Sequence, residues 1–306
     1  MEPHKIDPGV EVRVPAFAKL NLDLRVLYKR GDGFHELRSV FQTISLADQI
    51  GIRFRKARRT GIRMAGNVDI PDNLIVRAAR LVLDEMKVSA EVDFELDKRI
   101  PMGAGLGGGS SDAAAVLLAL PALAGKSIAV DRLIPLAAQL GSDVPFFLLG
   151  GTAAVLGRGE ELYPLEDLRS RFVLVVSPEI HVSTADAYRA LSARLTAESV
   201  RPKLTEFQAQ LWSGGDEWGT NDFETVVFEQ HPRLKSIRNG LLRAGATTAL
   251  MTGSGSSVFG IFASREAMET AAARFPKERI SRVRFLDRDA YRAAWWRRLG
   301  AAKAPG

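Results

Sequence analysis

The sequence predicts an α/β (α+β) protein, because segments with the period-two pattern of strands alternate with amphipathic or apolar segments typical of helices. Its 306 residues suit one large or two medium domains, and 46% hydrophobic with 25% charged residues is ordinary for a globular chain. The third observation is a glycine-rich loop that runs directly into an apolar helix, around which the rest of the chain is organised.

Composition excludes several classes of protein. The chain has no cysteine, so neither a disulfide framework nor a thiolate zinc site can form. The histidines are scattered without metal-ligand spacing, at His4, His35, His181 and His231. Neither a signal segment nor an apolar run of about 20 residues is present, so we expect a cytoplasmic protein without a membrane span.

The chain is basic, with a formal charge of +6 and an isoelectric point near 9.7. Its basic residues are spread out, with small clusters at 53–59 and 274–284 and no interleaved aromatic residues. A solvated basic surface that attracts anionic substrates is therefore favoured over a nucleic-acid interface.

In the first half, residues 1–9 are expected to be a loose leader and the strands are expected at 10–14, 19–26, 39–46, 50–55 and 92–96. In the second of these, Leu20 and Leu22 face one side, whereas Lys19 and Asn21 point together to the other. Asp72-Asn73 is expected to cap an amphipathic helix at 74–86, whose apolar stripe belongs to the core.

Five glycines fall within the seven residues Gly103 to Gly109. Such a loop can adopt positive φ angles and bring backbone N–H groups close to a ligand. An apolar helix follows, with Ser110 or Ser111 expected as N-cap and Asp112 in the first turn. Because the N–H groups and the positive end of the helix dipole point to one spot, we expect a polyphosphate site.

Three other interpretations of this loop are weaker. The pattern at 103–108 matches a dinucleotide fingerprint, but the acidic residue required about 20 positions later is replaced by Ile128. Gly125-Lys126-Ser127 resembles the end of a P-loop, but Leu120 stands where its first glycine belongs. An ordinary turn needs one or two glycines rather than five beside two serines.

In the rest of the chain, helices are expected at 131–140, from 184, at 221–242, at 265–274 and at 287–299, and strands at 152–156, 172–176 and 282–286. Gly141 ends the first helix, and Ser183 or Thr184 caps the second. A second glycine and serine loop at 251–260 runs into a strand. Trp295-Trp296 is expected to pack the last helix onto the body.

The residues alone leave several roles open. Lys19 and Asn21 suit a solvent-facing strand edge as well as a site, and His35 after a turn suits a surface position. Asp143, between Gly141 and an apolar run, suits a turn or a cap. Tyr188 suits the core, and Lys98 suits either the nucleotide pocket or a solvated strand end.

The segment Pro-Met-Gly-Ala-Gly-Leu-Gly-Gly-Gly-Ser-Ser-Asp-Ala-Ala at 101–114 resembles the ATP-binding loop of the GHMP small-molecule kinases, the family of galactokinase, homoserine kinase and mevalonate kinase. Further segments resemble the members that act on a cytidine-linked sugar alcohol: Pro-Ala-Phe-Ala-Lys-Leu-Asn-Leu at 15–22, Arg-Gly-Asp-Gly-Phe-His-Glu-Leu at 30–37 and Gly-Ser-Asp-Val-Pro-Phe-Phe at 141–147. The resemblance implies the two-domain GHMP kinase fold, with a nucleotide-binding domain at 1–165 and a ferredoxin-like domain at 166–306.

The resemblance also implies the site. Asp143 would be the catalytic base, and Lys19 beside it would favour its ionised form and offset charge on the transferring phosphoryl group. The implied ATP-binding residues are Asn73, Lys98, Pro101, Met102, Gly103, Ala104, Gly105, Leu106, Gly107, Gly108, Gly109, Ser110 and Ser111. The implied substrate-binding residues are Asn21, Phe34, His35, Thr184 and Tyr188. Phe34 stands where the family usually has tyrosine, which keeps the stacking ring and removes the hydroxyl.

The implied activity is an ATP-dependent kinase acting on the 2-hydroxyl of a cytidine diphosphate-linked methylerythritol in the non-mevalonate isoprenoid pathway. ATP would be co-substrate and carry Mg²⁺, without a dedicated protein metal site, and the chain would be a monomer or homodimer. Two alternatives remain: a related kinase acting on homoserine or mevalonate, and a non-catalytic sensor on the same fold, which the presence of both Lys19 and Asp143 disfavours. A nucleic-acid binder is a more distant possibility.

Overall fold

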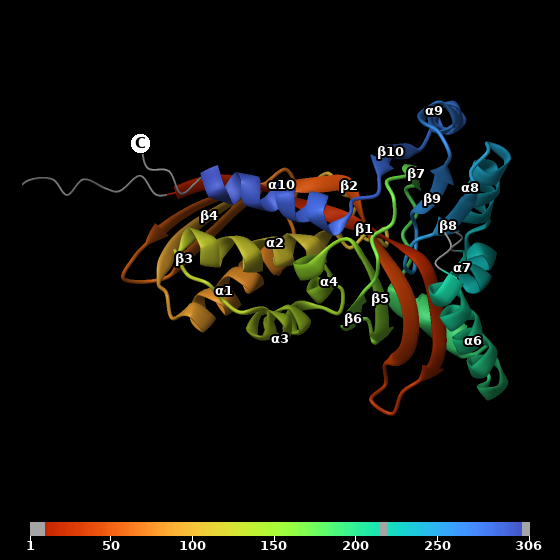
Figure 1. Ribbon diagram of the computed structural model, residues 1–306, viewed down its shortest axis with the longest axis horizontal. Helices are drawn as coiled ribbons and strands as arrows, with labels where there is room; N and C mark the ends of the chain where they lie inside the picture. The colour runs from red at the N-terminus through yellow and green to blue at the C-terminus, as the bar shows by residue number, and fades with distance from the viewer. Residues whose placement is uncertain (1–9, 214–218, 302–306) are drawn as a thin grey trace, which may run out of the picture.

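The computed structural model describes residues 10–213 and 219–301, so the expected leader lies outside the described residues. The described chain has two halves, each built on its own antiparallel-rich sheet, which lie side by side along the long axis of the molecule (Figure 1). Among the described helices, none combines the length and apolar character that crossing a membrane requires. The expected mixed α/β fold is confirmed.

Within the described residues, six strands form the first sheet, in the order β3-β4-β2-β5-β6 with β1 paired to β2. These strands are β1 (Val10–Lys29), β2 (His35–Lys56), β3 (Gly61–Gly66), β4 (Ala90–Asp97), β5 (Thr152–Gly157) and β6 (Glu161–Pro164). The prediction of two short strands in place of β1, and two more in place of β2, was wrong. Register shifts at Phe17/Lys19 and Asn21/Asp23 interrupt the alternation without ending the pairing.

Helices of the first half pack on this sheet around a single apolar core. They are α1 (Leu74–Met86), α2 (Gly108–Leu123), α3 (Val130–Leu140) and α4 (Val144–Leu149). The predicted bounds and cap of α1 are confirmed, since the Asn73 side chain accepts a hydrogen bond from the backbone N–H of Ile75. The last helix, α10 (Arg288–Ala301), returns to this half beside α2 (Figure 1). Trp295 is buried there as predicted, whereas the Trp296 side chain lies outside the described residues.

The second half has a four-stranded sheet, among the described residues, in the order β10-β7-β9-β8. Its strands are β7 (Phe172–Ser177), β8 (Thr248–Met251), β9 (Val258–Phe262) and β10 (Arg279–Arg284). Its helices are α5 (Thr184–Ser192), α6 (Ala197–Ser213), α7 (Glu224–Gln230), α8 (Pro232–Arg243) and α9 (Arg265–Ala272). The helical layer after β7 and the helix after β9 give the ferredoxin-like order that the resemblance implied.

Three features of the second half differ from the sequence prediction, one of which is β8 at Thr248–Met251, where no strand was predicted. The helix expected at 221–242 is divided into α7 and α8 at His231-Pro232, because proline lacks an N–H and suits the first turn of a new helix. Helix α6 was not predicted, since its apolar residues form no clear stripe and Pro202 lies inside it.

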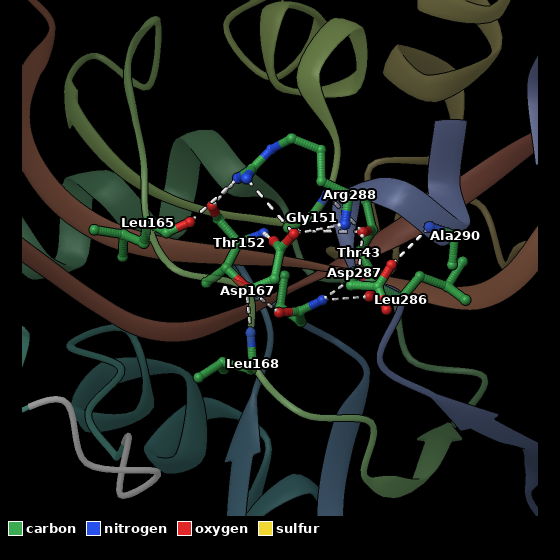
Figure 2. Close-up of polar contacts among 11 residues, drawn as sticks. Thr43, Gly151, Thr152, Leu165, Asp167, Leu168, Leu286, Asp287, Arg288 and Ala290 are labelled. Atoms are coloured by element: carbon green, nitrogen blue, oxygen red, sulfur yellow. Dashed lines mark hydrogen bonds and ion pairs between the residues drawn. The ribbon is translucent and has the colours of Figure 1, made fainter. Parts of the chain in front are cut away.

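The two halves meet at a polar seam, drawn in Figure 2. The Asp167 carboxylate accepts hydrogen bonds from the backbone N–H groups of Thr152 at 2.9 Å and Arg288 at 2.7 Å. The Arg288 guanidinium donates to the Thr152 carbonyl at 2.9 Å (Figure 2). Thr43 of β2 exchanges hydrogen bonds with Leu286, through its hydroxyl and its carbonyl, at 3.0 Å each. The seam therefore fixes both segments that connect the halves.

Candidate active site

The first glycine loop enters α2 earlier than expected. Helix α2 begins at Gly108, and its N-cap is Gly107 with φ of 70° rather than Ser110 or Ser111. Gly103 and Gly105 also have positive φ, at 63° and 77°. The prediction of a serine cap was wrong because a left-handed glycine can turn the chain into the helix without a side-chain cap. Both serines consequently lie in the first turn.

The two glycine loops pack directly on each other. A Cβ on Gly105 would lie 2.0 Å from the carbonyl oxygen of Thr252. The Thr252 hydroxyl accepts from the backbone N–H of Asn21 at 3.0 Å and lies 3.2 Å from the carbonyl of Gly105. The N–H of Ser257 donates to the Ala104 carbonyl at 3.2 Å. Both loops are recognisable in the sequence, whereas no local signal marks Thr252, the residue that joins them to β1.

We expect Gly105→Ala to lower the free energy of unfolding more than Gly125→Ala does. Both glycines have positive φ, where a side chain costs about 1–2 kcal/mol, but a Cβ on Gly125 meets nothing within 4 Å. Urea unfolding of the two variants isolates the clash between the loops. Equal losses would show that the loops do not pack as closely as described.

Lys19 and Asp143 form an ion pair beside the first loop. The Nζ atom of Lys19 lies 3.6 Å from Oδ2 of Asp143, and the two side chains are 4% and 32% exposed. Nζ also donates to Oδ1 of Asn21 at 2.6 Å and lies 4.5 Å from the centre of the Phe41 ring. Burial lowers the pKa of Lys19, and Asp143 opposes that shift. The Lys19 ammonium therefore contacts both the Asn21 amide and the Asp143 carboxylate.

Asp143 and Lys19 are brought together by the segments that flank them. Asp143 is the residue before α4, yet in the described chain its side chain makes no capping hydrogen bond. The backbone N–H of Lys19 donates to the Leu106 carbonyl at 3.0 Å, which ties β1 to the glycine loop. Lys19 and Asn21 are 3% and 2% exposed, so the solvent-facing strand edge is excluded for both.

A cavity of about 970 Å³ opens beside this pair. Its lining joins residues predicted for catalysis, phosphate binding and substrate binding: Lys19, Asn21, Phe34, His35, Gly103, Gly105, Gly107, Asp143, Thr184 and Tyr188. Asn73 instead lines a second cavity of about 600 Å³ beside β3 and α1. The volume of the larger cavity is suited to a small organic molecule.

Aromatic side chains form one wall of the larger cavity. His35 stacks on Tyr188 with ring centres 4.9 Å apart and 25° between the planes, and its Nε2 contacts the Ser192 hydroxyl. Phe34 is 53% exposed, and the guanidinium carbon of Arg158 lies over its ring, 4.8 Å from the ring centre. Burial lowers the pKa of His35 and raises that of Tyr188 to about 12. The stacking partner of Tyr188 is thus His35.

Lys98 lies in a buried cluster under the first glycine loop. Its Nζ is 2.6 Å from Oδ2 of Asp48 and 2.6 Å from Oδ2 of Asp112, and the three side chains are at most 5% exposed. Oδ1 of Asp48 accepts from the N–H groups of Arg99 at 2.6 Å and Ile100 at 2.7 Å. The solvated strand end is therefore excluded for Lys98. The cluster connects the start of the loop to the helix that follows it.

The Asp112 carboxylate in this cluster predicts a pH dependence of stability. Burial raises its pKa to about 7, the Lys98 ammonium opposes that shift, and Asp48 adds to it. An unfolded aspartate releases its proton near pH 4, whereas the folded chain keeps it to about pH 7, so this group lowers the free energy of unfolding as pH rises through that window. Urea unfolding across the window should give a smaller decrease for Asp112→Asn than for wild type. An unchanged slope would contradict the assignment.

The described residues contain no cluster of three or more carboxylate or histidine side chains that could hold a metal ion. The Oγ atom of Ser111 is buried at the first turn of α2 and has no hydrogen-bond partner among the described residues. A buried hydroxyl without a partner, next to a glycine-rich loop, is suited to contact an oxygen of a ligand or an ion that arrives with the ligand.

Comparison with known sequences gives matches over both halves. Residues 73–151 match the GHMP kinases N terminal domain, and residues 189–280 match the GHMP kinases C terminal domain. A 4-diphosphocytidyl-2-C-methyl-D-erythritol kinase of Solibacter usitatus is 53% identical over 289 residues, which cover 93% of this chain and 92% of the relative. The enzyme of that name from Geobacter sp. strain M21 is 40% identical, over 88% of this chain and 96% of its own.

Comparison with solved structures agrees. A crystal structure of 4-(cytidine 5'-diphospho)-2C-methyl-D-erythritol kinase superposes with a TM-score of 0.73 at 37% identity, over 89% of this chain and 98% of that one. Homoserine kinase from Cytophaga hutchinsonii superposes with a TM-score of 0.69 at 18% identity, over 94% and 97%, a likeness of fold alone.

Proposed function

The chain belongs to the GHMP kinase family, among its 4-diphosphocytidyl-2-C-methyl-D-erythritol kinases, and we propose that it transfers the γ-phosphoryl group of ATP to the 2-hydroxyl of that substrate, giving the 2-phosphate and ADP. This reaction belongs to the non-mevalonate pathway of isoprenoid biosynthesis. The observation that carries the proposal is the ion pair of Lys19 with Asp143, 3.6 Å apart, in a cavity that the first glycine loop also lines.

In the proposed reaction, Asp143 accepts the proton of the substrate hydroxyl as its oxygen attacks the γ-phosphorus. The bond from that phosphorus to the β,γ-bridging oxygen breaks, and ADP leaves. Lys19 offsets the charge that spreads over the transferring oxygens, and Asn21 holds Nζ in place at 2.6 Å. The backbone N–H groups at 103–110 bind the ATP phosphates, as the positive end of α2 favours, whereas the N–H of Ser111 already donates to the Gly107 carbonyl at 2.9 Å.

Mg²⁺ carried by ATP is part of the proposal. It would neutralise charge between the β- and γ-phosphates, and the buried hydroxyl of Ser111, with Ser110 beside it, is the protein group available to it or to a phosphate oxygen. We propose that Asn73 lies near the adenine in the second cavity. Lys98 is engaged by two carboxylates, so we propose that it serves the nucleotide by holding the loop.

The cytidine is proposed to bind along the aromatic wall, on Phe34, His35 and Tyr188, with Thr184 nearby. The Thr184 hydroxyl contacts that of Ser254 at 2.8 Å, so the second glycine loop borders the same space. Arg158, which the sequence did not single out, lies over Phe34 and would face the substrate diphosphate.

We expect Tyr188→Ala to raise the KM for the cytidine substrate by about 5- to 160-fold, because stacking of a base on an aromatic ring contributes roughly 1–3 kcal/mol. Tyr188→Phe keeps the ring and should change this KM little. Initial rates at varied substrate concentration measure both variants. A similar rise in KM for ATP in Tyr188→Ala would contradict a role on the cytidine side.

The proposed domain boundary lies at 165/166, which falls between β6 of the first sheet and β7 of the second. The last helix then crosses back onto the first domain. All proposed site residues come from one chain, so the reaction requires no second subunit, and a monomer or homodimer in the cytoplasm fits the proposal.

The test of the function is ADP release with Mg·ATP and each of three acceptors: 4-diphosphocytidyl-2-C-methyl-D-erythritol, homoserine and mevalonate. Turnover with the cytidine substrate alone is expected. Turnover with homoserine or mevalonate instead would keep the family and overturn the acceptor. ATP binding without turnover on any acceptor would favour a non-catalytic sensor on the same fold.

A further inference from the structure

A second hollow, the arginine groove, lies at the junction of β2, β10 and α10. It has a volume of about 650 Å³, and its described lining shares no residue with the larger cavity. Its apolar and neutral lining consists of Pro15, Phe17, Ser45, Leu46, Ala47, Gln49, Ser281, Val283 and Ala294. Its charged lining consists of Arg99, Arg282, Arg297 and Arg298. The proposed reaction gives the groove no task.

The charges of the arginine groove are unbalanced. Among its described lining residues none is acidic. Arg99 pairs with Asp97 and Arg282 with Glu269, both at 2.6 Å, outside the lining. In the described part of the chain, neither Arg297 nor Arg298 has an ion-pair partner, since the Nε of Arg297 donates only to the backbone carbonyl of its own helix. Two positive charges therefore remain at a concave site, which favours an anion.

From these residues we propose that the arginine groove binds a small phosphate or diphosphate ester whose other end is aliphatic. A guanidinium group can donate two parallel hydrogen bonds to the oxygens of one phosphate, so these arginines suit a phosphate group. Between them the lining includes the apolar side chains of Leu46, Ala47 and Ala294, which can contact an aliphatic group. Among its described lining residues the one aromatic is Phe17, which is only 9% exposed, so this part of the lining offers no stacking surface to a nucleobase.

The groove is also connected to the first glycine loop. Arg99 lies between Lys98 and Ile100, and its backbone N–H donates to the Asp48 carboxylate of the buried cluster. Its carbonyl accepts from the Arg279 guanidinium of β10. A bound anion that contacts Arg99 together with Arg282 therefore joins the start of the loop to the second half. Occupancy should consequently change the KM for ATP rather than the KM for the acceptor.

The binding test is isothermal titration calorimetry with inorganic phosphate, pyrophosphate and pentyl diphosphate. A saturating non-hydrolysable ATP analogue keeps these probes from the glycine loop. The variant is Arg297→Gln/Arg298→Gln, and the matched control is Arg265→Gln/Arg292→Gln, which removes two exposed arginines outside the groove. We expect pentyl diphosphate to bind at least about fivefold more tightly than pyrophosphate. The groove variant should weaken it at least about tenfold, and the control should leave it unchanged.

Each other result overturns the proposal. Equal affinity for pyrophosphate and pentyl diphosphate would show that the apolar side chains of the groove do not contribute to binding. Equal loss of affinity in both variants would show non-specific attraction. Absence of pentyl diphosphate binding, with duplex DNA or RNA bound in its place, would assign the groove to nucleic acid. Because binding is measured without turnover, this outcome is independent of the kinase reaction. If pentyl diphosphate binds, an unchanged KM for ATP would overturn the connection to the loop.

Discussion

Asp143→Asn is expected to lower kcat by about 10²-fold or more, with the KM values for ATP and acceptor nearly unchanged. Asparagine keeps the size of the side chain but cannot accept the proton of the attacking hydroxyl, and a positioned general base contributes typically 10²–10⁴-fold. A loss confined to kcat is the kinetic pattern of an interaction made in the transition state. Steady-state rates at saturating ATP measure it.

Two comparisons make this result specific. Asp131→Asn removes a carboxylate from the first turn of α3, outside the cavity lining, and should leave kcat unchanged. Lys19→Met should lower kcat to a similar extent, and the double variant should lose much less than the product of the two, because the 3.6 Å pair acts as a unit. Full activity in Asp143→Asn would remove this residue from the chemistry.

Lys98→Met is expected to lower the free energy of unfolding by about 3–5 kcal/mol, because it leaves Asp48 and Asp112 buried without their cation. The control Lys277→Met removes an exposed lysine and should stay within about 0.5 kcal/mol of wild type. Urea unfolding monitored by circular dichroism gives both values.

A second variant tests whether the unpaired carboxylates cause the loss of stability. Lys98→Met/Asp112→Asn leaves one unpaired carboxylate instead of two, so it should recover part of the stability. A loss below about 1 kcal/mol in Lys98→Met would contradict the buried cluster. Recovery of stability without recovery of the KM for ATP would show that the intact cluster also positions the glycine loop.

Local patterns predicted much of this fold. The bounds of α1 follow from an amphipathic stripe and its Asn73 cap, and the glycine loop before α2 follows from five glycines in seven residues. The adjacency of Lys19 to Asp143 came only from resemblance, since the two residues are far apart in sequence and meet through the pairing of β1 with the loop. Tertiary contacts of that kind leave no local signal.

The failures have physical causes as well. Register shifts hid the length of β1, and a left-handed Gly107 took the cap position that was predicted for one of two serines. The pairing of Lys98 with Asp48 and Asp112 joins three separate elements, so a strand-end lysine gave no sign of burial. The same holds for Thr252, whose role depends on the contact between two loops.

The proposed phosphoryl transfer is tested most directly by identifying the product formed from Mg·ATP and 4-diphosphocytidyl-2-C-methyl-D-erythritol, using phosphorus NMR and tandem mass spectrometry. The proposed arrangement of Asp143, Lys19 and the glycine loop predicts one new phosphate monoester on the 2-hydroxyl, formed in step with ADP. Release of inorganic phosphate with the acceptor unchanged, or a phosphate on another hydroxyl, would contradict it.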